Sequence, residues 1–522
     1  MARSVKLLAL LALVLFAAQF IIPASQRPLP RRPHVLVIHA DQYRFDCVGT
    51  VGNPDVKTPS LDSLARDGVL FRNSFCTWPV CTPSRYSLLS GQYVRQHRGR
   101  SNVATLLPGT ATFANLLRAA GYRTNAVGKM HFMPAYLDVG FTELQLAEQN
   151  GRGRLVDDHH RYLKERGLID SVDLIDQEQP YRSQAPESYW KSFGAGMSNL
   201  PEEHHSTTWI GNRSVEVISR WTPEEPALLM VGFIKPHHPF DPPAPWDAMY
   251  DPSKLRVLPG WIEEPLERDL RRPGYFDNRT LTLPALRRVM AHYYATISQL
   301  DAQVGRMIDL LKRKAIYDDT LIIFTSDHGE YLGFHHLLLK GNLMYDPLVK
   351  VPLIIKFPHS KYARKMSGAL VSSTDVTSTI LRESGVEAAP DMRGHSLQSI
   401  CAGEEAGRDL IFAEDGGFVM VRSLTRKFLY SSEPGRSLFF DLEKDPLEMH
   451  DLAGDSRYNA ELQNMKDALL RWFQVDAQTS PYLDLQARQI RQPNVPPDRI
   501  TAERQMEEYI RLQMRAVLKS GK

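Results

Sequence analysis

The feature that most constrains the fold of this chain is the alternation of short apolar runs with helix-like segments. Residues 34–40 are almost continuously apolar, as expected for a strand that is buried on both faces of a sheet. Similar strand-like runs occupy residues 227–234, 320–325 and 351–356. Helices are predicted over residues 59–66, 112–120, 286–314 and 376–384. This alternation predicts an α/β fold with a mostly parallel sheet sandwiched by helices.

The pattern changes from about residue 411. Short strand-like runs at 418–422, 427–431 and 437–442 are separated by turn residues, which predicts a small antiparallel sheet. A helix is expected over 460–473 and a charged C-terminal helix over 501–518, whereas residues 142–226 and 251–285 are expected to form irregular loops over the sheet edge. The expected division is a leader at 1–25, an α/β domain at 33–405, an antiparallel-sheet subdomain at 406–485 and a helical tail at 486–522.

The N-terminus is predicted to be a cleaved secretory signal peptide. Arg3 and Lys6 precede an apolar run over 7–22, and small residues suited to cleavage follow at 23–26. An uncleaved membrane anchor is the alternative, but the run is short for a bilayer span, and no later stretch is long and apolar enough to be one. We therefore expect a secreted, periplasmic or lumenal protein.

The charge balance argues against a nucleic-acid partner. Lys and Arg number 63 against 60 Asp and Glu, which leaves a net charge of +3 over 522 residues. The absence of a long basic run also favours a small or terminal substrate over a long polyanionic glycan.

Polar and ionisable side chains follow four of the predicted strands. The first strand is followed by Asp41 and Gln42, and the segment 123–127 by Lys129 and His131. The strand ending at residue 234 is followed by His237 and His238, and the strand ending at residue 325 by Asp327 and His328. Ligands bind beyond the carboxyl ends of the strands in open α/β sheets, so these groups are candidates for one site.

Asp41, Asp327 and His328 are candidate ligands of a single divalent cation. Carboxylate oxygens suit Ca²⁺, Mg²⁺ or Mn²⁺, and the imidazole of His328 leaves the choice of ion open.

A cysteine stands at the start of a predicted helix. Thr82 is expected to cap this helix and Pro83 to occupy its first turn, which places Cys81 just ahead of the helix N-terminus. The helix dipole favours an anion at that position.

The segment Cys81-x-Pro83-Ser84-Arg85 resembles the maturation signature of type I sulfatases, in which the cysteine is oxidised to formylglycine after translation. The likeness runs from about residue 33 to 455, and the other matching blocks follow in the family order: residues 58–65 with 68–71, 90–91, 121–124, 128–131, 235–240, 326–330, 340–345 and 440–448. The resemblance implies an alkaline phosphatase-like α/β fold and a sulfuric ester hydrolase that acts through a formylglycine hydrate and a divalent metal.

The resemblance also implies a set of site residues. The implied catalytic residues are Cys81, Arg85, Lys129, His131, His237 and Lys340, of which Lys129, His237 and Lys340 would also bind substrate. The implied metal ligands are Asp41, Gln42, Asp327, His328 and the modified Cys81, and the implied ion is Ca²⁺, with Mg²⁺ or Mn²⁺ as alternatives.

The implied roles follow from the family. Arg85 and Lys129 would fix the hydrated formylglycine and the sulfate, and His237 and Lys340 would stabilise or protonate the leaving alcohol oxygen. His131 would be the base that releases the sulfate. A formylglycine-generating enzyme is the implied partner during maturation.

Two departures from the commonest sulfatase pattern keep other activities open. Many arylsulfatases carry two adjacent Asp residues where this chain has Asp41-Gln42, and Asp-Asn where it has Asp327-His328. These variants also resemble choline sulfatases, some glycan sulfatases, and phosphonate or phosphodiester monoester hydrolases. The substrate is expected to be a sulfated sugar or a small alkyl or aryl sulfate. The alternatives are a phosphonate or phosphodiester monoester hydrolase and, in another class, an inactive carbohydrate-binding relative.

Overall fold

The computed structural model describes residues 32–149, 154–270, 275–341, 343–431 and 433–475, together with the pairs 483–484 and 489–490. The predicted signal peptide at 1–25 and the predicted helix at 501–518 lie outside the described residues.

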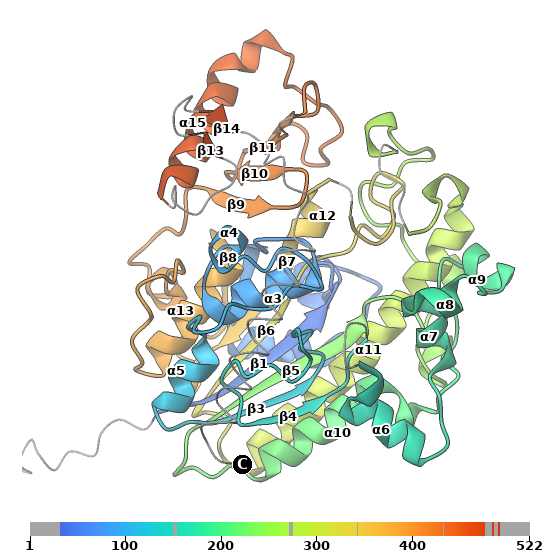
Figure 1. Ribbon diagram of the computed structural model, residues 1–522, viewed down its shortest axis with the longest axis vertical. Coiled ribbons are helices and arrows are strands. Elements are labelled where there is room, and N and C mark those ends of the chain that lie inside the picture. Colours follow the sequence, from blue (N-terminus) through green and yellow to red (C-terminus); the bar gives the residue numbers. More distant parts are fainter. Residues whose placement is uncertain are drawn as a thin grey trace, which may run out of the picture.

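An eight-stranded sheet forms the centre of the molecule, in the order β4-β3-β5-β1-β6-β7-β2-β8 (Figure 1). Its strands are β1 (His34–Asp41), β2 (Val69–Phe75), β3 (Arg123–Gly128), β4 (Glu143–Leu146), β5 (Ala227–Pro236), β6 (Thr320–Ser326), β7 (Lys350–Lys356) and β8 (Lys365–Ser372). Neighbouring strands pair in parallel, except that β7 runs antiparallel to both β6 and β2. The prediction of a mostly parallel sheet is confirmed.

Helices cover both faces of this sheet and create two separate cores. Along β1, Leu36 and Ile38 face one core, whereas Val35 and Val37 face the other. The first core is closed by α2 (Pro59–Asp67), α10 (Ser206–Ser219) and α11 (Leu283–Arg313), and the second by α3 (Cys81–Ser90), α5 (Phe113–Ala119), α13 (Ser373–Glu383) and α14 (Leu397–Ala402). Burial on both faces explains why the strands are continuous apolar runs.

The expectation of irregular loops over residues 142–226 is wrong in part. This segment contains strand β4, the long helix α10 and four short helices: α6 (Asp158–Glu165), α7 (Ser171–Gln177), α8 (Gln179–Arg182) and α9 (Glu187–Lys191). The Ser- and Thr-rich start of α10 hides its helical pattern, but Trp209, Ile210 and Val217 are buried on one side of it. Figure 1 shows α7, α8 and α9 on the flank opposite α5 and α13.

A second, four-stranded antiparallel sheet lies above the large one in Figure 1, as predicted. It contains β9 (Ile411–Glu414), β10 (Val419–Arg422), β11 (Arg426–Tyr430) and β12 (Leu438–Asp441), and α15 (Asn459–Val475) packs against it. Two further short helices are α4 (Val94–His97) and α12 (Asp346–Val349). The two-residue strands β13 (Leu483–Asp484) and β14 (Gln489–Ile490) pair with each other in antiparallel orientation. The domain boundaries stay predictions.

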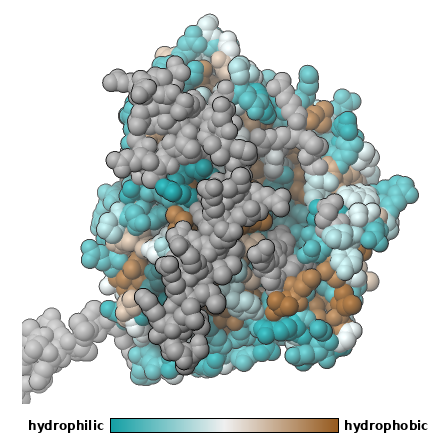
Figure 2. Space-filling model, in the orientation of Figure 1, coloured by the Kyte–Doolittle hydropathy of each residue, from teal (hydrophilic) through white to brown (hydrophobic). Residues whose placement is uncertain are grey.

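The described surface is mostly hydrophilic on the face that Figure 2 draws, with hydrophobic residues gathered toward its lower right (Figure 2). Among the described helices, none has the length and apolarity that crossing a bilayer requires.

Candidate active site

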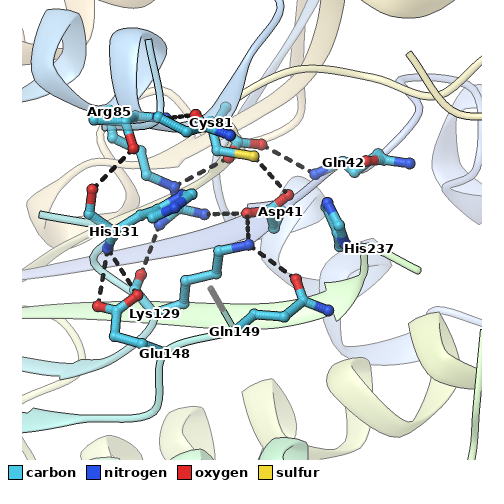
Figure 3. Close-up of polar contacts among 12 residues, drawn as sticks. Asp41, Gln42, Cys81, Arg85, Lys129, His131, Glu148, Gln149 and His237 are labelled. Atoms are coloured by element: carbon cyan, nitrogen blue, oxygen red, sulfur yellow. Dashed lines mark hydrogen bonds and ion pairs between the residues drawn. The ribbon is translucent and has the colours of Figure 1, made fainter. Parts of the chain in front are cut away.

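Four adjacent parallel strands, β3, β5, β1 and β6, end at one edge of the large sheet. Their carboxyl ends carry the polar residues singled out in the sequence, and these side chains meet there with Cys81 of α3 (Figure 3). The chain order of these strands differs from their spatial order, so the site brings into contact residues that are as far as 298 positions apart.

Asp41, Cys81, Asp327 and His328 form a compact group of potential metal ligands. One ligand atom from each lies within 4.8 Å of the others, and all four residues are buried. The Nδ1–H of His328 donates to the carbonyl of Gly329 at 2.9 Å, so Nε2 is the ring nitrogen that faces this group, 3.4 Å from Cys81 Sγ. Two carboxylates, one sulfur position and an imidazole nitrogen are a suitable donor set for a divalent cation.

Arg85 connects the two carboxylates of this group. Its Nε donates to Asp327 Oδ2 at 3.0 Å, its Nη2 to Asp41 Oδ2 at 2.9 Å and its Nη1 to the carbonyl of Lys129 at 2.6 Å. The guanidinium is fully buried, so its donors are directed at the ligand carboxylates and the neighbouring backbone. Arg85 therefore holds Asp41 and Asp327 in place.

Cys81 is the first residue of α3, and Val80 is the N-cap. The expectation that Thr82 caps this helix is wrong, because its hydroxyl donates instead to the carbonyl of His131 at 3.0 Å. The Thr82 N–H is satisfied by Asn102 Oδ1 at 3.1 Å. Burial and Asp41 raise the pKa of the Cys81 thiol, but Lys340 and Lys129 outweigh them and hold it well below its ordinary value.

Lys129 places its ammonium between Asp41 and Gln149. Lys129 Nζ lies 2.7 Å from Asp41 Oδ2 and donates to Gln149 Oε1 at 3.0 Å (Figure 3). Burial raises the pKa of Asp41, but Lys129, His237 and Arg85 together hold it well below its ordinary value. Asp41 is therefore an ionised carboxylate that faces several cationic groups.

His131 is held by its backbone, and its ring has no hydrogen-bond partner in the part of the chain that the structure describes. It adopts a left-handed conformation, with φ of 56°. Its N–H donates to the Glu148 carboxylate at 2.9 and 3.1 Å. Both ring nitrogens are buried and have no hydrogen-bond partner among the described residues. A buried imidazole with two free nitrogens is available for proton transfer or anion binding.

Lys340 reaches the same group from the loop that follows β6. Its Nζ lies 3.2 Å from Cys81 Sγ, 3.2 Å from His328 Nε2 and 2.9 Å from Gln42 Oε1. Burial lowers the pKa of Lys340, but Cys81 and Asp41 raise it above its ordinary value, so the amine is protonated. Gln42 is fixed from its other side by a hydrogen bond to Glu330.

His237 and His238 take different positions. The Nδ1–H of His237 donates to the carbonyl of His238 at 2.6 Å, and its Nε2 has no partner among the described residues. The Nδ1 of His238 instead contacts Asp176 Oδ2 at 2.6 Å, and the two rings are stacked with centroids 4.2 Å apart. Burial, Lys340 and His238 hold the pKa of His237 well below its ordinary value.

The small sheet holds the loop that carries Lys340. Arg422 of β10 donates to the Asp346 carboxylate at 3.1 and 2.8 Å, and Lys427 of β11 to the same group at 3.1 Å. The Asp346 N–H donates to Glu448 at 2.7 Å. Because Asp346 begins α12 six residues after Lys340, the C-terminal part of the chain restrains the position of that lysine.

Several residues of the site were missed in the sequence. Glu148, Gln149 and Asp176 lie in the segment that was expected to be irregular, and their contacts depend on how that segment packs. Two other histidines near Lys340 pack against the protein: His335 Nε2 contacts the carbonyl of Leu447 at 2.7 Å, and His336 stacks on Trp261 with centroids 4.6 Å apart.

Comparison with known proteins gives consistent matches. The family model described as Sulfatase matches residues 33–386. An arylsulfatase of Clostridium perfringens is 29% identical, covering 84% of this chain and 94% of that protein. A choline-sulfatase of Rhizobium meliloti is 30% identical over 82% of this chain and 83% of that protein. The crystal structure of the phosphonate monoester hydrolase of Agrobacterium radiobacter aligns with a TM-score of 0.72 and 25% identity, covering 88% of this chain and all of that one.

Proposed function

Because this chain belongs to the sulfatase family and is a sulfuric ester hydrolase, we propose that it cleaves a sulfate monoester at a formylglycine derived from Cys81. The observation that carries this proposal is the position of Cys81. Its sulfur lies 3.6 Å from Asp41 Oδ1, 3.4 Å from His328 Nε2 and 3.2 Å from Lys340 Nζ, so residue 81 is at the centre of the polar cluster.

We propose that a divalent cation is held by Asp41, Asp327, His328 and the modified residue 81, with Gln42 Oε1 at the edge of the group. The oxygen-rich donor set favours Ca²⁺, with Mg²⁺ or Mn²⁺ as alternatives. The ion would lower the pKa of a hydroxyl at position 81 and neutralise charge on the sulfuryl group.

Three side chains bind the sulfate group and the leaving oxygen. Lys129, whose ammonium pairs with Asp41, and Lys340, whose ammonium contacts residue 81, bind the sulfate oxygens. Lys340 is the proton donor to the leaving alcohol oxygen, because its amine is protonated, and His237 binds that oxygen through its unpartnered Nε2.

His131 and Arg85 have roles other than binding the leaving oxygen. His131, with both ring nitrogens free among the described residues, takes the proton when sulfate is released. Arg85 acts on the two carboxylates, because three of its five N–H donors are bonded to Asp41, Asp327 and a backbone carbonyl.

We also propose that the protein is secreted, periplasmic or lumenal. The N-terminal sequence supports cleavage of a signal peptide, and a formylglycine-generating enzyme would act on the segment around Cys81. The substrate class is a sulfated sugar or a small alkyl or aryl sulfate.

The second candidate is a phosphonate or phosphodiester monoester hydrolase. Asp41-Gln42 and Asp327-His328 favour it, as does the likeness to the phosphonate monoester hydrolase of Agrobacterium radiobacter. A phosphodiester carries the same single negative charge as a sulfate monoester, so charge alone does not separate the two substrates.

Substrate preference is the test of the proposed function. We expect kcat/KM for a phenyl sulfate to exceed kcat/KM for the phenyl phosphodiester and phenyl phosphonate with the same leaving group. The comparison uses one preparation of mature enzyme, and a panel of sulfated sugars follows. A higher kcat/KM for either phosphorus ester would overturn the assignment in favour of the second candidate.

A further inference from the structure

The orientation of His237 depends on its neighbour in the chain. The ring of His237 is 2% exposed, and a single hydrogen bond, from Nδ1 to the carbonyl of His238, determines which nitrogen faces the site. Among the described residues, the ring of His237 has one aromatic contact, the stacked ring of His238. Any group that fixes the peptide or the ring of His238 therefore also fixes His237.

Asp176 of α7 fixes the ring of His238. Asp176 is fully buried, and its Oδ2 accepts from His238 Nδ1 at 2.6 Å. Tyr189 donates to its other carboxylate oxygen, while Arg182 Nε and the Tyr275 hydroxyl donate to its backbone carbonyl. Burial raises the pKa of Asp176, but His238 and the side-chain hydrogen bonds from Tyr189 and Gln177 hold it below its ordinary value, so the carboxylate is ionised.

Gln149 fixes the peptide of His238. Its Nε2 donates to the His238 carbonyl at 2.7 Å, the same oxygen that accepts from His237. Its Oε1 accepts from Lys129 at 3.0 Å, and the side chain is fully buried. One amide therefore connects the sulfate-binding lysine with the histidine on the leaving-group side, and Figure 3 draws its hydrogen bond with Lys129.

We propose that Asp176 and Gln149 are positioning residues that orient His237, acting through the ring and the peptide carbonyl of His238. Both come from residues 142–226, outside the motif blocks of the family resemblance. The same segment supplies Gln177, whose Nε2 also donates to the His238 carbonyl, at 3.3 Å, so several hydrogen bonds from residues 142–226 reach the groups around His237. The inference rests on the proposed contact of His237 with the leaving oxygen.

If His237 is displaced, the loss of kcat/KM is expected to depend on the acidity of the leaving alcohol. A misplacement of about 1 Å in a catalytic group can cost about 10²-fold in rate. Charge accumulates most on the bridging oxygen when the leaving alcohol is weakly acidic, so a displaced His237 harms those substrates most. Asp176→Asn keeps the shape of the side chain and removes its charge.

The experiment measures kcat/KM for a series of substituted phenyl sulfates of graded acidity and for an alkyl sulfate. For Asp176→Asn we expect a loss of roughly 10- to 100-fold on the weakly acidic alcohols and below about 3-fold on the most acidic phenol. In a His237→Ala background, Asp176→Asn should cost no more than about 2-fold, because a residue that acts through His237 has nothing left to orient.

Two further variants separate positioning from general stability. Tyr189→Phe removes the hydrogen bond to the other oxygen of Asp176 and leaves the His238 contact intact, so the wild-type leaving-group dependence should persist. His238→Gln removes the imidazole that contacts Asp176 and should show the same leaving-group-dependent loss of kcat/KM as Asp176→Asn. It serves as the test if Asp176→Asn does not fold.

Two results would overturn the inference. One is a loss of kcat/KM in Asp176→Asn that is the same for every ester in the series. The other is an equal loss from Asp176→Asn in the wild-type and the His237→Ala backgrounds. Wild-type enzyme that hydrolyses none of the sulfate esters would instead contradict the proposed function, so the two failures are distinguishable.

Discussion

Cys81→Ser is expected to lower the turnover of a sulfate ester by roughly 10⁴-fold or more, in line with the loss of other covalent nucleophiles. Serine offers one hydroxyl at position 81, whereas a formylglycine hydrate offers two. The single hydroxyl can accept a sulfuryl group, but no second hydroxyl remains to expel it. We therefore expect at most one equivalent of alcohol per protein molecule, measured by rapid-quench assay of a phenyl sulfate.

Cys76→Ser is the matched control for this prediction. Cys76 is also fully buried and lies five residues upstream, but it packs in an apolar cluster and is not part of the metal-ligand group. Its variant should keep wild-type kcat. Repeated turnover by Cys81→Ser at a rate within about tenfold of wild type, a difference of only about 1.4 kcal/mol in barrier height, would contradict the proposed nucleophile.

Asp327→Asn is expected to remove the divalent cation together with activity. Asp327 belongs to the ligand group, and its Oδ2 also accepts from Arg85 at 3.0 Å. Loss of the carboxylate leaves Arg85 and Lys129 facing Asp41 alone, so the site no longer has enough negative charge to hold a dication. We expect a fall in kcat of about 10³-fold, as for removal of a major electrostatic stabiliser.

Metal content is the direct measurement for this second prediction. Purified wild-type protein should contain one divalent cation per chain and Asp327→Asn none. Added Ca²⁺ at about 100 times its Kd should stabilise the wild type by about 3 kcal/mol and leave the variant unchanged. Asp346→Asn is the control, because that partly buried carboxylate pairs with Arg422 outside the ligand group and its variant should retain the metal. One divalent cation per chain in purified Asp327→Asn, as in the wild type, would refute the assigned set of metal ligands.

The central strands could be predicted because their sequences follow directly from their burial. A strand covered on both faces, such as β1 (His34–Asp41), is a continuous apolar run, and the polar residue that follows it marks its carboxyl end. Asp41, Asp327 and His328 were found in this way. Their contact with Cys81 could not be derived from spacing, because α3 reaches them only through packing on the sheet.

The site residues in segment 142–226 could not be predicted from the sequence. Strand β4 has four residues at the edge of the sheet, so its apolar pattern is short, and Glu148 and Gln149 after it carried no signal. Asp176 sits on a seven-residue helix, and its partner His238 is 62 positions away. Such contacts depend on the tertiary position of a polar segment, which periodicity does not encode.

The choice between His237 and His238 rested on resemblance alone, since both follow the same strand. The structure distinguishes them by their partners: Asp176 occupies the Nδ1 of His238, whereas His237 keeps Nε2 without a partner among the described residues. The assignment of His237 to the leaving oxygen stays a proposal.

The most direct test of the formylglycine mechanism is the mass of the tryptic peptide of residues 73–85, taken from protein made in its native host and active on sulfate esters. This peptide contains Cys76 and Cys81, so Cys76 serves as an internal standard for a free thiol. After denaturation and alkylation, we predict one alkylated thiol, at Cys76, and an aldehyde in place of the thiol at Cys81. Two alkylated thiols throughout an active preparation would contradict the account.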